Sequence, residues 1–110
     1  MIISEIKKGN IYVFNIEGRL DSNTSVQFEE KVCNAIEAGE SNLLVDFSQM
    51  DYISSAGLRV ILMAAKKTKA VGGKIVLTSL NENVKEVFDI AGFSSIFSIY
   101  PSQEDALKVI

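Results

Sequence analysis

Residues 46–59 read DFSQMDYISSAGLR, and this stretch decides the fold. The apolar run that leads into it, residues 43–47, is nearly continuous, as in strands that are buried on both faces. The polar residues that follow predict a loop. A helix is expected to begin near Ser55, because apolar residues recur at helical spacing from Leu58 onward, and to end at Gly72-Gly73. A strand, a loop and a helix in this order are typical of the functional rim of an α/β sheet.

The rest of the chain alternates between β-rich runs and helical patterns. Residues 2–6 and 11–16 are β-rich and flank a polar turn with Gly9, which predicts a β-hairpin. Thr24 and Gln27 have the spacing of a capping box at the start of a helix. Strands are further expected at 43–47, 74–79 and 96–100, and helices at 24–38, from 55 to Gly72-Gly73, from about 84 to Gly92, and after Ser102. The order ββαβαβαβα predicts an α/β fold with a mixed, mostly parallel sheet that opens with a hairpin.

The composition predicts a single domain over residues 1–110 and limits its partners. The chain carries a formal net charge of −3 and is 47% hydrophobic, so it can bury one core and offers no basic stripe for nucleic acid. It lacks the run of about 20 apolar residues that a membrane helix needs, and its first residues do not resemble a signal peptide. We therefore expect a cytoplasmic protein that binds neither nucleic acid nor membrane. Histidine is absent and Cys33 is the only cysteine, which removes most zinc-binding and catalytic arrangements and weighs against an enzyme.

Ser54 and Ser55 stand where the central helix is expected to begin. A hydroxyl there can accept a hydrogen bond from a free amide of the first turn, so helix capping alone would account for one of them. Ala56 and Gly57 leave the first turn with little side chain, which would let a bulky partner approach the backbone. A small accessible hydroxyl suits a protein kinase, and a helix N-terminus favours the charge of a phosphate. One of the serines is therefore a candidate for phosphorylation.

The segment ending Ser54-Ser55-Ala56-Gly57-Leu58 resembles the phosphorylation loop of STAS domains in the anti-sigma factor antagonist family. GRLD at 18–21 resembles that family's Gly-x-Leu-Asp turn, GGK at 72–74 its glycine turn, and VFDIAGF at 87–93 its third helix, so the resemblance covers practically the whole chain. The family usually places Asp or Ser directly before its target serine. This implies that Ser55 is phosphorylated, with Ser54 as the alternative because Ala56 replaces the Ser or Thr of many members.

The resemblance also implies a partner-switching cycle. The unmodified protein would bind an anti-sigma factor that is also a serine kinase, and so release the sigma factor. Phosphorylation would end the binding, and a metal-dependent serine phosphatase would reset the switch. ATP and Mg²⁺ would belong to those two enzymes, so no cofactor is expected on this chain, which should be a monomer when free.

Further residues are expected to lie beside Ser55. Asp21, Asp46 and Asp51 each fall at or near the end of a predicted strand, where a shared acidic rim would attract a basic surface of the kinase. Turn formation would also explain Asp21, and simple solvation Asp51. Met50 and Tyr52 are either packing residues or partner contacts, because exposed apolar side chains in a functional loop often anchor a partner. The expected partner-binding residues are Asp21, Asp46, Met50, Asp51, Tyr52, Ser54, Ala56, Gly57 and Leu58.

Parts of the sequence also suit other functions. Within the same fold, the chain could be a STAS scaffold, or a subunit of a transport or signalling complex, that is not phosphorylated. The aspartates would also suit a receiver-like domain with Mg²⁺, but such folds begin strand-helix and need an adjacent acidic pair that residues 2–8 lack. A small enzyme or nucleotide-binding domain is disfavoured, because the sequence has neither a phosphate-binding glycine loop nor a nucleophile paired with a base.

Overall fold

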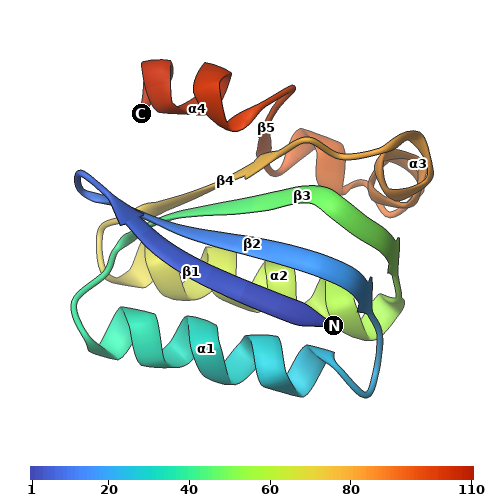
Figure 1. Ribbon diagram of the computed structural model, residues 1–110, viewed down its shortest axis with the longest axis horizontal. Helices are drawn as coiled ribbons and strands as arrows, with labels where there is room; N and C mark the ends of the chain where they lie inside the picture. The colour runs from blue at the N-terminus through green and yellow to red at the C-terminus, as the bar shows by residue number, and fades with distance from the viewer.

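The computed structural model describes all residues, 1–110, as an α/β fold built on one sheet (Figure 1). The elements are β1 (Ile2–Lys8), β2 (Ile11–Leu20), α1 (Ser25–Glu37), β3 (Asn42–Ile53), α2 (Ser55–Ala70), β4 (Lys74–Thr78), α3 (Glu82–Ile90), the 3-10 helix η1 (Phe93–Ser95), β5 (Ser98–Tyr100) and α4 (Gln103–Val109). The strands lie in the order β1-β2-β3-β4-β5; β1 is antiparallel to β2, and the other pairs are parallel. The predicted order ββαβαβαβα and the mixed sheet are confirmed.

Helices cover both faces of the sheet. α1 and α2 lie against one face, and α4 lies across the opposite face (Figure 1). α3 contributes Val84 and Phe88 to the same large core that α1 and α2 close. A second, smaller cluster lies under α4, where Ala106 packs on Val13 and Leu44.

β3 is the central strand, and its apolar run is buried on both faces. Leu43, Val45 and Phe47 point into the large core, while Leu44 points into the small cluster under α4. Successive side chains of a strand face opposite sides, so a strand covered by helices on both sides is apolar at nearly every position, with Asp46 as the one polar residue of this run. This is the physical reason that the sequence at 43–47 predicted a buried strand.

β2 and β3 are longer than predicted, and the predicted loop at residues 48–53 is wrong. The two strands run to Leu20 and Ile53, and their parallel pairing continues past two register shifts, between Asn15 and Glu17 and between Gly18 and Arg19. Bulges of this kind disturb the alternation of polar and apolar residues from which strands are predicted. Ser54 alone separates β3 from α2.

Two local predictions are also wrong. The side chain of Thr24 caps no amide of α1. Its hydroxyl donates to the carbonyl of Arg19 at 2.7 Å and accepts from the amide of Asp21 at 2.9 Å, so it serves the turn between β2 and α1 instead of a capping box. The last strand begins at Ser98 and not at residue 96, because the chain before it forms η1.

Candidate functional site

The start of α2 is hydrogen-bonded to the end of β2. The amide of Ser54 donates to the carbonyl of Leu20 at 2.9 Å. Ser54 is the N-cap of α2, and its Oγ accepts a hydrogen bond from the amide of Gly57 at 3.2 Å. Of the two serines at the helix start, Ser54 is therefore the one that caps the helix.

Ser55 is the first residue of α2 and is exposed. Its hydroxyl is engaged by no other group of the protein, whereas the hydroxyl of the adjacent Ser54 is occupied by the capping hydrogen bond. The unpaired amides at a helix N-terminus carry partial positive charge, which favours an anion nearby. The side chain of Ser55 is thus an accessible hydroxyl in a setting that tolerates added negative charge.

Gly57 faces inward, which corrects the expectation that a partner could approach the helix backbone there. A Cβ atom at Gly57 would lie 2.7 Å from the carbonyl oxygen of Leu20 and 2.9 Å from Cγ1 of Ile53. The glycine is required because the first turn of α2 packs directly on the ends of β2 and β3. Leu58 is also buried in the large core, so neither residue is available to a partner.

Asp21 organises the turn that precedes α1. Its Oδ1 accepts hydrogen bonds from the amides of Asn23 at 3.0 Å and Thr24 at 3.1 Å. The amide of Thr24 is the main cause that holds the pKa of Asp21 below its ordinary value. The carbonyl of Leu20, the residue before Asp21, accepts a hydrogen bond from Ser54, so Asp21 lies beside the first turn of α2. Asp21 also stabilises the turn before α1 through the two hydrogen bonds that it accepts.

Tyr52 and Arg19 form the exposed part of the rim. They are paired across β2 and β3, and the guanidinium carbon of Arg19 lies 4.2 Å from the centroid of the Tyr52 ring. Nε of Arg19 is also 3.8 Å from Oδ2 of Asp21. Tyr52 is 41% exposed, and Asp51 beside it is exposed as well. The structure therefore brings Asp21, Asp51 and Tyr52 to the expected end of the sheet.

Asp46 and Met50 do not lie at this rim, contrary to the prediction. Asp46 is 5% exposed; its carboxylate accepts from the amide of Ser48 at 2.7 Å and from Nε2 of Gln103 in α4 at 2.6 Å. Met50 is 2% exposed and packs in the large core. Both errors have one cause: β3 continues to Ile53, so Asp46 is in the middle of the strand, roughly 20 Å of strand away from its end.

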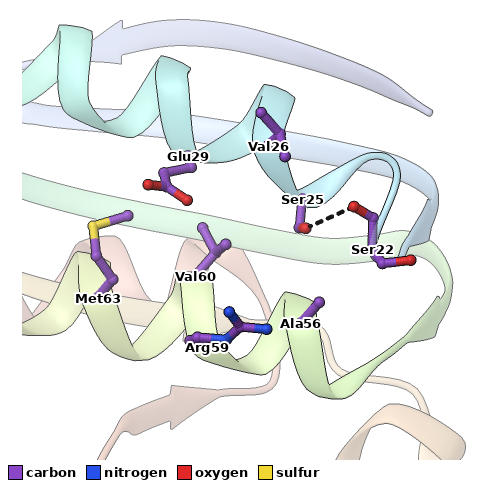
Figure 2. Close-up of a pocket in the computed structure, with 8 residues that line it drawn as sticks. All are labelled: Ser22, Ser25, Val26, Glu29, Ala56, Arg59, Val60 and Met63. Carbon is purple, nitrogen blue, oxygen red and sulfur yellow. Dashed lines mark hydrogen bonds between the residues drawn. The ribbon is translucent and has the colours of Figure 1, made fainter.

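A groove of about 440 Å³ opens between α1 and α2 next to the first turn of α2 (Figure 2). It is lined by Ser22, Ser25, Val26 and Glu29 on the α1 side and by Ala56, Arg59, Val60 and Met63 on α2. Val26 is 57% exposed, which is unusual for an apolar residue in the first turn of an amphipathic helix. The α1 side of this groove was missed from the sequence, and the exposed Val26 off the apolar stripe is the one signal that could have indicated it.

Two further observations concern metal ions and membranes. Its cysteine, aspartate and glutamate side chains nowhere gather in a group of three or more that could hold a metal ion. None of its helices combines the length and the apolar character that crossing a membrane requires.

Comparison with known proteins identifies the family. The chain matches the STAS domain over residues 3–106. It is 42% identical to BtrV of Bordetella bronchiseptica over 91 residues, 83% of this chain and 78% of that protein, and 30% identical to the anti-sigma-B factor antagonist of Bacillus subtilis over 94 residues, 86% and 85% of the two chains. The anti-sigma factor antagonist SpoIIAA of Bacillus has the same fold in its unphosphorylated form (TM-score 0.78, 19% identity, 99% and 100% of the two chains) and its phosphorylated form (TM-score 0.78, 20% identity, 97% of each). The chain therefore belongs to the STAS domain family of anti-sigma factor antagonists, which are regulatory binding proteins and not enzymes.

Proposed function

We propose that this protein is a phospho-switch that binds an anti-sigma factor when unmodified and is switched off by phosphorylation of Ser55. One observation carries the proposal: the Ser55 hydroxyl is exposed and free, while the adjacent Ser54 hydroxyl is used to cap α2. The existence of a phosphorylated form of SpoIIAA, which has the same fold, supports the same kind of control here. The partner would be an anti-sigma factor with serine kinase activity.

The proposed phosphorylation requires only one group of this chain, the hydroxyl of Ser55. Oγ of Ser55 would attack the γ-phosphorus of ATP held by the kinase, so that a new P–O bond forms, the bond to ADP breaks, and the hydroxyl proton passes to a base of the kinase. ATP and Mg²⁺ would be bound by that kinase. A metal-dependent serine phosphatase would hydrolyse the ester and restore the hydroxyl. This chain contributes an accessible nucleophile on a rigid helix end.

The phosphate would act on binding and would leave the fold intact. It adds about −1.5 to −2 charges at a helix N-terminus, where negative charge is favourable, so α2 need not unfold. A phosphate about 6 Å from one carboxylate of a bound partner would cost roughly 1 to 5 kcal/mol, depending on screening. Since about 1.4 kcal/mol corresponds to a factor of ten, the affinity should fall about ten-fold or more.

The contact surface for the anti-sigma factor is the groove between α1 and α2 together with the exposed rim at Tyr52. Both adjoin the first turn of α2, so a partner bound there would cover Ser55. Val26→Ser should weaken binding about ten-fold, because it removes an exposed apolar side chain from the lining of the groove. Val109→Ser is the matched control: Val109 is 67% exposed, on α4 at the opposite face of the sheet, and its replacement should leave the affinity unchanged.

The experiment that tests the switch is mass spectrometry of the protein isolated from its own cells, with peptide mapping across residues 49–59. Phosphate on Ser55 is the expected result. Phosphate on Ser54 alone would keep the switch and correct the residue, whereas no phosphate under several growth conditions would refute the switch and favour a STAS scaffold that is not phosphorylated.

Binding measurements complete the test. With the isolated kinase, Ser55→Ala should bind as wild type does and resist modification, while Ser55→Asp should bind more weakly. Equal affinity of wild type and the phosphorylated protein for the kinase would contradict the electrostatic mechanism.

A further inference from the structure

The first two turns of α2 contain one cationic side chain, Arg59, four residues after Ser55. Residues i and i+4 are neighbours on one face of a helix. Side chains of an α-helix lean toward its N-terminus, so Arg59 extends back over the turn that begins with Ser55. Figure 2 shows its guanidinium directed toward Ala56, the residue next to Ser55.

Arg59 is exposed and is not neutralised by any carboxylate. Glu29 faces it across the groove, but the ion pairs of the protein are Lys7–Glu40, Arg19–Asp21, Lys31–Glu5 and Lys85–Asp89. Arg19, the other arginine near this rim, is already engaged by the ring of Tyr52 and by Asp21. Arg59 is therefore the free cation closest along the helix to the proposed phosphorylation site.

We infer that Arg59 is the intramolecular ligand of the phosphate on Ser55; this inference rests on the proposed function. A guanidinium presents a planar set of donors that matches two phosphate oxygens, and it stays charged at any physiological pH. The i, i+4 spacing lets it reach the ester without unwinding the helix. Phosphorylation then changes the contact surface for the anti-sigma factor in two ways. It adds negative charge at Ser55, and it neutralises the free positive charge of Arg59 in the groove between α1 and α2.

The test uses phosphoserine incorporated at position 55 during translation and a pH titration of its ³¹P resonance. A nearby cation favours the doubly charged ester, so the second pKa of the phosphate should be a few tenths of a unit higher in Arg59→Gln than in wild type. Arg59→Lys should retain most of the wild-type value. The matched control is Lys66→Gln, which removes the same charge from an exposed position two turns further along α2 and should leave the titration unchanged.

Coincident titration curves for wild type and Arg59→Gln would overturn the inference, as would an equal shift in Lys66→Gln, which would indicate a general charge effect. Because the phosphoserine is installed without a kinase, this result does not depend on whether Ser55 is modified in the cell. Absence of phosphate from the cellular protein would refute the proposed function alone, so the two failures are distinguishable.

Discussion

The hydroxyl of Ser54 accepts a hydrogen bond from the amide of Gly57 at 3.2 Å and so closes the first turn of α2. The adjacent Ser55 is exposed, and its hydroxyl makes no such hydrogen bond. The two neighbouring serines therefore have different roles: Ser54 caps the helix, and Ser55 presents a free hydroxyl at the surface.

This division predicts that alanine substitutions of the two serines differ in their effect on stability. Ser54→Ala should lower the free energy of unfolding by about 1 kcal/mol, because an amide of the first turn loses its acceptor. Ser55→Ala should change it by less than about 0.5 kcal/mol, since the side chain is exposed and makes no hydrogen bond. Urea denaturation of both variants measures the difference. A larger loss for Ser55→Ala would mean that the hydroxyl of Ser55 has a structural partner.

The close contact at Gly57 predicts that Gly57→Ala is destabilising, although alanine is the better helix former. The new methyl group would lie 2.7 Å from the carbonyl oxygen of Leu20, a backbone atom that cannot move without shifting β2. Overpacking of this kind costs about 1 to 3 kcal/mol, more than the gain of about 1 kcal/mol in helix propensity.

Ala56→Ser is the control for Gly57→Ala. It adds an atom at the neighbouring position, where the side chain lines the groove and not the core, so its unfolding free energy should stay near that of wild type. If Gly57→Ala proved as stable as Ala56→Ser, the packing of α2 on Leu20 would be looser than the contact distance implies.

The order of elements could be predicted because each helix and strand carries its own periodic pattern and its own stop signal. The extension of β3 could not, since the register shifts opposite Asn15–Arg19 place polar and apolar residues out of alternation. That single error moved Asp46 to the wrong place, because a residue in the middle of a strand was taken for one at its end.

The site was predictable as far as it lies within one segment. The segment 52–55 contains Tyr52, Ser54 and Ser55, which are close to one another in the chain. Asp21 directly follows the end of the neighbouring strand, β2. The groove depends on how α1 packs beside α2, and the inward orientation of Gly57 depends on the position of Leu20, which is distant in sequence. Such contacts between distant segments leave no local pattern.

The hydrogen bonds of Asp21 predict a loss of stability in acid. Amides of Thr24 and Asn23 hold the pKa of this carboxyl below its ordinary value of 3.8 in the folded state. A lowered folded-state pKa stabilises the protein above the unfolded-state pKa, and this contribution disappears as the pH falls through the folded-state pKa. Wild type should therefore be more stable than Asp21→Asn near neutral pH, and the difference should vanish in acid.

Urea denaturation at a series of pH values from neutral to acidic measures this difference. Asp51→Asn is the control, because it removes an exposed carboxylate at the same rim that accepts no backbone hydrogen bond. A gap between wild type and Asp21→Asn that persists unchanged in acid would show that the effect of Asp21 does not depend on its ionisation.

The position of Asp46 predicts a residue that supports the fold and takes no part in binding. Asp46→Ala leaves the amide of Ser48 without its acceptor and removes one of the two acceptors of Nε2 of Gln103, which keeps only Oδ1 of Asn15; this should lower the unfolding free energy by roughly 2 kcal/mol. The affinity of the folded protein for an anti-sigma factor should be unchanged, because α4 lies on the sheet face opposite α1 and α2.

Asp51→Ala should show the reverse pattern. Its stability should stay within about 0.5 kcal/mol of wild type, since Asp51 is exposed, and its binding to a basic partner surface should be weaker. Denaturation and titration calorimetry on the same two variants separate these effects, and weaker binding by folded Asp46→Ala would place that carboxylate back in the contact surface.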